Sequence, residues 1–232
     1  TIETTGFGTA EPTESWTAIS NVKGHINYRH EDLESGMVLP KGTLLLSVDQ
    51  GLYTLALAEA DADIAGIEAE IAQLNQEAIN VSALLEIEQK RLDLAETDLQ
   101  RTLALLESGA VSQTVYDTQL RATLQQRLAV QNYLNQQNTF PVQLSRLNAQ
   151  KDRTNTKRAL ALSDLDDTKI YAPFEFRVSE VSVEMYQYIN PGQILFAGDG
   201  VDASDVVLQM PMQSMRRALI ELPSTEGSIN IS

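Results

Sequence analysis

Two histidines and two adjacent acids near the N-terminus are the residues with the clearest capacity for chemistry. The stretch HINYRHED contains His25, His30, Glu31 and Asp32. Imidazole nitrogens and carboxylate oxygens bind zinc, but a zinc site needs three or four ligands in a defined arrangement. Two histidines five residues apart with no defined third ligand form a weak pattern. We therefore expect ordinary exposed side chains here and no metal site.

A second group of residues could bind a protein. Arg101, Leu105 and Ser112 lie in the stretch RTLALLESGAVS. An arginine offers several hydrogen-bond donors to carbonyls and carboxylates, and a leucine offers an apolar knob. The alternative is that Arg101 only faces solvent and that Leu105 packs internally, so the surrounding elements decide between the two interpretations.

A long helix must carry the first two of these residues. Between Tyr53 and Glu107 there is no proline, and Gly66 is the only glycine. Thirteen positions with a 3-4 spacing hold eleven apolar residues, and these positions are 64, 67, 71, 74, 78, 81, 85, 88, 92, 95, 99, 102 and 106. A seam with this heptad spacing predicts a partner helix along its whole length.

The partner is expected to be the segment from Ser112 to Leu165. Its expected seam is less regular and consists of leucines, at positions 120, 124, 128, 134, 144, 147, 160, 162 and 165. Pro141 is expected to kink or break this helix, because proline removes one backbone hydrogen bond. Residues 59–107 carry a net charge of −9 and residues 112–167 carry +2, so antiparallel neighbours would attract.

The stretch between the two segments predicts a tight turn. Gly109 suits the left-handed position that ends a helix. Ser112 suits the N-cap of the next helix, where its hydroxyl would meet a free backbone N–H. These residues therefore predict a helical hairpin over 53–167 with its tip at 107–112, although turn chemistry alone also explains both of them.

Strand patterns flank the hairpin on both sides. Runs rich in β-branched and aromatic residues, bounded by Gly and Pro, lie before residue 50 and after residue 168. The simplest topology is one β-domain interrupted by a helical insertion. The net charge of −15 makes nucleic acid an unsuitable partner, and the chain has no cysteine for disulfides or thiolate chemistry.

The two flanking halves also look alike. LESGMVLPKGTLLLSVD (33–49) and VEMYQYINPGQILFAGD (183–199) share an apolar position, a turn with Gly, and an apolar run that ends near Asp. They resemble the half-motifs of a split lipoyl-like domain. With the hairpin between them, the chain resembles the HlyD-like family of periplasmic adaptors, or membrane fusion proteins, of tripartite efflux and secretion systems.

This resemblance implies an α+β fold: a split lipoyl-like β-sandwich, a long antiparallel coiled-coil hairpin inserted in it, and part of a β-barrel domain. The domains expected from it are strands of the barrel or membrane-proximal region (1–22), the first lipoyl-like half (23–52), the hairpin (53–167), the second half (168–200) and the partial barrel (201–232). The barrel is incomplete in this chain, so we expect it to belong to a longer protein.

The tip pattern adds an implied function. Adaptors that bind TolC-like channels carry Arg, three residues, Leu, six residues and Ser, and Arg101, Leu105 and Ser112 match this spacing. The resemblance implies an adaptor in the periplasm that joins an inner-membrane transporter, of the RND multidrug-efflux type, to an outer-membrane channel. It also implies a homo-oligomeric ring, by analogy a hexamer, and an inner-membrane anchor outside this chain. The alternatives are an adaptor of type I protein secretion and a coiled-coil scaffold without a transport role.

An enzyme or cofactor carrier is not expected. Lipoyl-like domains can carry lipoate or biotin on a hairpin lysine, but Lys41 lies in LPKGT without the flanking methionines of a carrier, and we interpret it as a turn residue. No catalytic cluster and no cofactor is predicted. The chain departs from the family at Phe176, where a small glycine is usual, and at Met185 and Tyr186, where a glycine is usual before the last hairpin.

Overall fold

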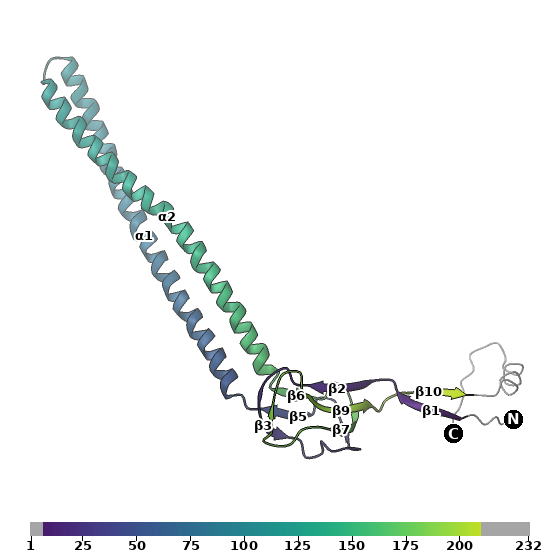
Figure 1. Ribbon diagram of the computed structural model, residues 1–232. Helices are drawn as coiled ribbons and strands as arrows, with labels where there is room; N and C mark the ends of the chain where they lie inside the picture. The colour runs from purple at the N-terminus through teal and green to yellow at the C-terminus, as the bar shows by residue number, and fades with distance from the viewer. Residues whose placement is uncertain (1–6, 210–232) are drawn as a thin grey trace, which may run out of the picture. The chain divides into compact units, whose positions relative to one another are not determined.

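A computed structural model describes residues 7–209 of the chain. The chain divides into two compact units, one formed by Thr1–Leu52 with Ser163–Ser232 and the other by Tyr53–Leu162. The first unit contains the β-strands and the second is a helical hairpin (Figure 1). The α+β class predicted from the sequence is therefore confirmed.

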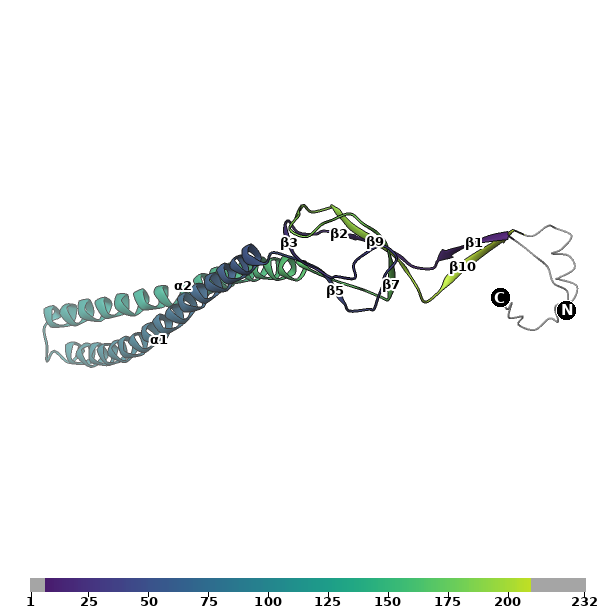
Figure 2. The same ribbon diagram turned by 90° about the horizontal axis from the view of Figure 1, so that it is seen from below.

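Eight strands of the first unit form a sandwich of two four-stranded antiparallel sheets. The strands before the hairpin are β2 (Ser15–Ile19), β3 (Gly24–Arg29), β4 (Val38–Leu39) and β5 (Leu44–Val48). The strands after it are β6 (Lys169–Tyr171), β7 (Phe176–Val181), β8 (Tyr188–Ile189) and β9 (Ile194–Gly200). Figure 2 shows the strands of this unit from below.

Each sheet takes two strands from each half of the chain. One sheet has the order β2-β9-β7-β4 and the other β6-β5-β3-β8. Replacing each strand of the first sheet by its counterpart in the other half (β2 with β6, β3 with β7, β4 with β8, β5 with β9) reproduces the second sheet. The two halves therefore close on each other as an interlocked pair, as the similar half-motifs predicted.

Aromatic residues fill the centre of the sandwich. The Trp16 ring lies edge-on to Phe176 and Phe196, with centroid distances of 5.4 and 5.0 Å. Phe176 is fully buried, and a Cβ atom added to Gly198 would lie 2.2 Å from its ring. Phe176, where the family usually has a glycine, is thus a core residue, and Gly198 opposite leaves the space for it.

Two further strands form a separate ribbon. β1 (Phe7–Pro12) pairs antiparallel with β10 (Ser204–Gln209). Segment 1–22 thus contributes β1 to this ribbon and β2 to the sandwich. Of the segment 201–232, in which we expected part of a barrel, the structure describes residues up to 209, including β10, and residues 210–232 lie outside the described part of the chain.

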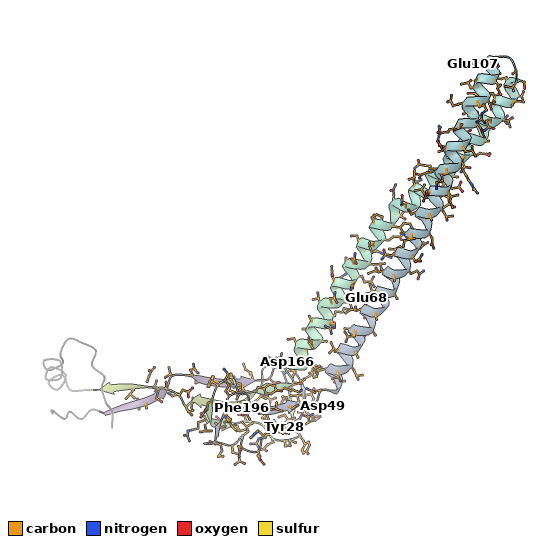
Figure 3. The ribbon with its side chains drawn as sticks, turned by 180° about the vertical axis from the view of Figure 1, so that it is seen from behind. Tyr28, Asp49, Glu68, Glu107, Asp166 and Phe196 are labelled. Carbon is orange, nitrogen blue, oxygen red and sulfur yellow. The ribbon has the colours of Figure 1, made fainter. Side chains whose placement is uncertain are left out.

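The hairpin consists of two helices of similar length. α1 runs over Gly51–Glu107 and α2 over Gln113–Asp166, with 57 and 54 residues. Figure 3 labels Glu68 partway along α1 and Glu107 at its end. At ~1.5 Å per residue each helix is ~80–85 Å long.

The seam of α1 lies where its spacing predicted. All thirteen predicted positions are buried or half-buried, and Ile67, Leu74 and Val81 are among the most buried residues of the helix. Leu74 and Val81 pack with Phe140 and Leu147 of α2 in the apolar cluster of the hairpin. The heptad prediction for α1 is therefore confirmed.

The prediction for α2 was wrong about which residues form the seam. The buried and half-buried residues follow a regular 3-4 spacing from Tyr116 to Leu165, which includes Thr123, Val130, Phe140 and Leu147. Six of these buried or half-buried seam residues are polar, namely Gln119, Thr123, Gln126, Gln137, Lys151 and Thr154. Only three of the nine leucines named from the sequence lie on this seam, and those at positions 124, 128, 160 and 162 are exposed.

Pro141 does not break α2, contrary to one of the outcomes expected from the sequence. The helix continues through it from Gln113 to Asp166. The neighbouring residue Phe140 is buried in the hairpin cluster with Leu74 and Val81. We attribute the unbroken helix to this packing, which holds both sides of the proline in place although one backbone hydrogen bond is missing.

Ion pairs join the two helices as their opposite charges predicted. Acidic residues of α1 pair with basic residues of α2 in Glu96–Arg127 at 2.6 Å, Glu68–Lys151 at 2.7 Å and Asp61–Arg158 at 2.5 Å. Most of these side chains are substantially exposed, so each pair contributes at most about 1 kcal/mol. Their main effect is to fix the antiparallel register.

Candidate partner-binding tip of the hairpin

The turn between the helices is closed by hydrogen bonds around Gly109. The N–H of Gly109 donates to the Leu106 carbonyl and the N–H of Ala110 donates to the Leu105 carbonyl, both at 2.9 Å. This is the Schellman arrangement, and it requires a left-handed residue at the position of Gly109, whose φ is 78°. Gly109 thus occupies the left-handed position of this turn.

Ser112 precedes α2 but does not cap it with its side chain. Its backbone carbonyl accepts from the N–H groups of Val115 and Tyr116 at 3.0 and 3.4 Å, as an N-cap residue does. Its hydroxyl makes no hydrogen bond to the described residues, although the sequence suggested one. The hydroxyl is exposed at the tip and is free to bind another molecule.

Arg101 lies on an exposed face of α1, less than two turns before its end. Its guanidinium donates to the Asp98 carboxylate at 2.6 Å, and 66% of its side chain is exposed. Arginine has five N–H donors, so one ion pair leaves donors free. Asp98 therefore orients the guanidinium without using all of its donors.

Leu105 does not pack into the hairpin. Its exposed fraction is 42%, whereas its neighbour Leu106 lies on the seam and is half-buried. Arg101 and Leu105 are four residues apart and so share one face of α1. Neither residue forms a hydrogen bond or ion pair with Ser112, which lies beyond the turn.

Arg101 and Leu105 are the last two residues of a longer stripe on α1 that was not predicted from the sequence. Positions one residue before the α1 seam also follow a 3-4 spacing, and we call them the outer stripe: Leu84, Ile87, Arg91, Leu94, Asp98, Arg101 and Leu105. All four of its apolar members are exposed, Leu94 most of all with 62% of its surface. This stripe could have been found in the sequence as a second heptad pattern beside that of the seam. Such a pattern indicates a face of α1 that could pack against a further partner.

The seam beneath the outer stripe includes polar residues. Gln126 of α2 donates to the Glu88 carboxylate, which also accepts from Arg91 at 2.7 Å. The Thr123 hydroxyl lies 3.2 Å from the Ala95 carbonyl across the seam. Polar groups at seam positions specify register at some cost in stability.

His25 and Lys41 are exposed and His30 is half-buried. His25 lies 3.1 Å from the carbonyl of Tyr186 and His30 lies 4.0 Å from Asp32. Among residues 7–209, no three His, Cys, Asp or Glu side chains are grouped so that they could hold a metal ion. Lys41 is an exposed residue in the turn between β4 and β5.

Neither long helix is a candidate membrane span. Within the described part of the chain, no helix combines the length and the apolar character that crossing a bilayer requires.

Comparison of the fold with known proteins gives consistent neighbours. No protein-family profile and no curated protein sequence matches the chain. The structure of the periplasmic adaptor protein EmrA is 15% identical, with 90% of this chain and 78% of that chain covered and a TM-score of 0.52. MacA from Actinobacillus actinomycetemcomitans is 17% identical, with 93% and 59% covered and a TM-score of 0.52.

A third neighbour belongs to the same class. The membrane fusion protein Spr0693 from Streptococcus pneumoniae R6 is 13% identical, with 86% and 64% covered and a TM-score of 0.51. The chain thus spans less than two thirds of the MacA and Spr0693 structures. At these identities the likeness establishes the fold alone, and that fold is the one shared by periplasmic adaptors and membrane fusion proteins, as the sequence resemblance implied.

Proposed function

We propose that this chain is part of a periplasmic adaptor that connects an inner-membrane transporter to a TolC-like outer-membrane channel. The observation that carries the proposal is the exposed tip. A hairpin of two ~80 Å helices ends in a rigid Schellman turn, and Arg101, Leu105 and Ser112 all present free groups there. A scaffold function would account for the hairpin but not for the interlocked sandwich at which both helices begin and end.

We assign the tip to the channel. Arg101 supplies hydrogen-bond donors to carbonyls or carboxylates of the channel, Leu105 inserts as an apolar knob, and the Ser112 hydroxyl adds a further hydrogen bond. The outer stripe extends this surface down α1. Because Asp98 already orients the Arg101 guanidinium, little side-chain freedom is lost on binding.

We assign the transporter to the barrel region, of which the β1–β10 ribbon is the described part. The length of the arms and the tip pattern favour an RND-type multidrug transporter over a type I secretion system. In this proposal the protein acts in the periplasm, is held at the inner membrane by a part outside this chain, and assembles as a ring, by analogy a hexamer. It has no catalytic role and needs no cofactor.

Substitutions at the tip test the channel contact. Leu105→Asp or Arg101→Asp in the full-length protein is expected to abolish export in cells that lack the wild-type gene. Because both side chains are exposed, the melting temperature should stay unchanged. Gln100→Asp, an exposed position off the outer stripe, is the matched control and should export normally. Wild-type export by both tip variants would contradict the assignment.

A further inference from the structure

Two turns of the sandwich are near-copies of each other. They comprise residues 33–42 and 183–192, in which equivalent positions are 150 residues apart. Gly42 and Gly192 have φ values of 84° and 82°. The N–H of Met37 donates to the Glu34 carbonyl at 3.1 Å, and its counterpart Gln187 donates to the Glu184 carbonyl at 3.2 Å.

The copies differ at the position that needs a left-handed backbone. Gly36 occupies it in the first turn, with φ 90°, and Tyr186 occupies it in the second, with φ 66°. A bulky side chain in this conformation is a strained outlier that the rest of the structure must hold in place. Tyr186 is nevertheless 75% exposed and has no ring contact with the described residues. The backbone is held in this conformation by the Tyr186 N–H, which donates to the Ile26 carbonyl at 3.0 Å, and by the Tyr186 carbonyl, which lies 3.1 Å from Nδ1 of His25. The side chain itself has no such contact.

The first turn has no side chain at the matching position, and we call the open space above Gly36 the Gly36 notch. A Cβ atom placed on Gly36 would meet no atom within 4 Å. The Arg177 guanidinium donates to the Gly36 carbonyl at 3.1 Å and is exposed. Within residues 7–209 Arg177 forms no ion pair, so its charge is available beside the notch.

The second turn carries groups that complement the notch. Glu184 lies two residues before Tyr186, is exposed, and forms no ion pair with the described residues. Exposed apolar side chains flank both turns, with Met37 and Val38 beside the notch and Met185 beside Tyr186. The second turn therefore presents an exposed tyrosine beside a carboxylate, and the first turn presents the Gly36 notch beside a guanidinium.

We propose that Tyr186 of one copy of this chain seats in the Gly36 notch of the next copy. The ring would lie against the Arg177 guanidinium, a favourable cation–π arrangement, and Glu184 would pair with the same cation. A second copy is the occupant because the matching groups lie on symmetry-related turns of one sandwich. Two different surfaces meet, so the contact is head-to-tail and can close a ring. The inference rests on the proposed function only for the assumption that the chain self-assembles.

Cysteine pairing tests the geometry directly, because the chain contains no cysteine. Chains carrying Tyr186→Cys are mixed with chains carrying Met37→Cys and oxidised mildly. We expect the mixed disulfide to exceed either homodimer several-fold. A product dominated by the 186–186 disulfide, or no disulfide between chains, would overturn the head-to-tail contact.

The variant Tyr186→Gly distinguishes an effect on the contact between copies from an effect on the stability of the fold. Glycine removes the strain, so the melting temperature is expected to rise by about 2–4 °C. Self-association, measured by analytical ultracentrifugation on the full chain, should weaken at least tenfold. Tyr171→Ala, at another exposed tyrosine outside both turns, should leave association unchanged. Stabilisation without any loss of association would contradict the proposal.

A charge exchange completes the test. Glu184→Arg should weaken association, and combining it with Arg177→Glu should restore it. These measurements need neither transporter nor channel, so loss of export in the tip variants leaves them unaffected. A wild-type chain that stays monomeric at millimolar concentration would overturn this inference, while the channel contact at the tip would still stand.

Discussion

The base half (residues 51–81 and 140–166) and the tip half (residues 82–107 and 113–139) of the hairpin follow one seam geometry with different chemistry. In the base half, the seam buries Leu74, Val81, Phe140 and Leu147 as one apolar cluster. In the tip half the same spacing brings together Glu88 and Gln126, and Thr123 with the Ala95 carbonyl. Most seam residues of α1 beyond Leu85 are only half-buried.

This difference places the more stable part of the hairpin in the base half and the surface suited to a partner in the tip half. The apolar cluster stabilises the base half, whereas the polar pairs in the seam of the tip half fix register and contribute less stability. The four exposed apolar residues of the outer stripe, three leucines and one isoleucine, also lie in the tip half, so the less stable half is the one that presents a surface for a partner. Substitutions in the two halves should therefore have different effects.

The largest expected effect is in the base half. Phe140→Ala should lower the free energy of unfolding by about 3–5 kcal/mol, because it removes a buried aromatic ring and leaves a cavity. Urea denaturation followed by circular dichroism measures it. Leu128→Ala, in the tip half and 65% exposed, should change this energy by less than about 0.5 kcal/mol. Equal losses for the two variants would remove the distinction between the halves.

Pro141→Ala should stabilise the same base half. Alanine supplies the N–H that proline lacks and allows a hydrogen bond to the carbonyl four residues earlier, in a helix that is already continuous. We expect a gain of about 1–3 kcal/mol, measured by the same denaturation. A loss of stability would show that the proline conformation itself is required.

For the polar pair Glu88 and Gln126 in the tip half, we expect the single and the double variant to change the free energy of unfolding in opposite directions. Gln126→Leu alone should destabilise by about 1–2 kcal/mol, since the Glu88 carboxylate loses a donor in the seam. Glu88→Leu with Gln126→Leu should stabilise by about 1–2 kcal/mol, because two apolar residues replace the pair. A double-mutant cycle measures both. Additive losses would mean that the polar seam is a source of stability.

The smallest expected effect belongs to an exposed pair. The hydrogen bond and the charge of Lys90 hold the pKa of Glu86 below its usual value. A lowered pKa in the folded state stabilises above the usual pKa, and this contribution is lost as the pH falls through the lowered value. NMR titration should show the Glu86 pKa rising towards its usual value in Lys90→Met. An unchanged pKa would mean that the pair does not persist in solution.

The fold was predictable where local chemistry and spacing agree. Gly109 and the apolar positions of α1 located the first helix, its seam and its turn. The similar half-motifs, with Gly42 and Gly192 in matching turns, predicted that the two β halves close on each other. Each of these features depends on residue types that permit few alternatives.

The sequence failed where tertiary packing overrides residue type. The α2 seam accepts Thr123, Gln126 and Thr154, while leucines such as Leu128 face outward, so a search for leucines could not find it. Pro141 stays helical because its neighbour Phe140 is buried. The Ser112 hydroxyl was expected to cap α2, but only the backbone carbonyl of Ser112 forms hydrogen bonds with the described residues of the helix.

Photo-crosslinking in intact cells tests the central claim most directly. A photoreactive amino acid replaces Leu105 in the full-length protein, and Ile79, exposed on α1 but ~39 Å from position 105 along the helix, is the matched control position. We expect position 105 to give an adduct whose second protein is identified by mass spectrometry as an outer-membrane channel, with no such adduct from position 79. Adducts with the channel at both positions, or at neither, would contradict the account.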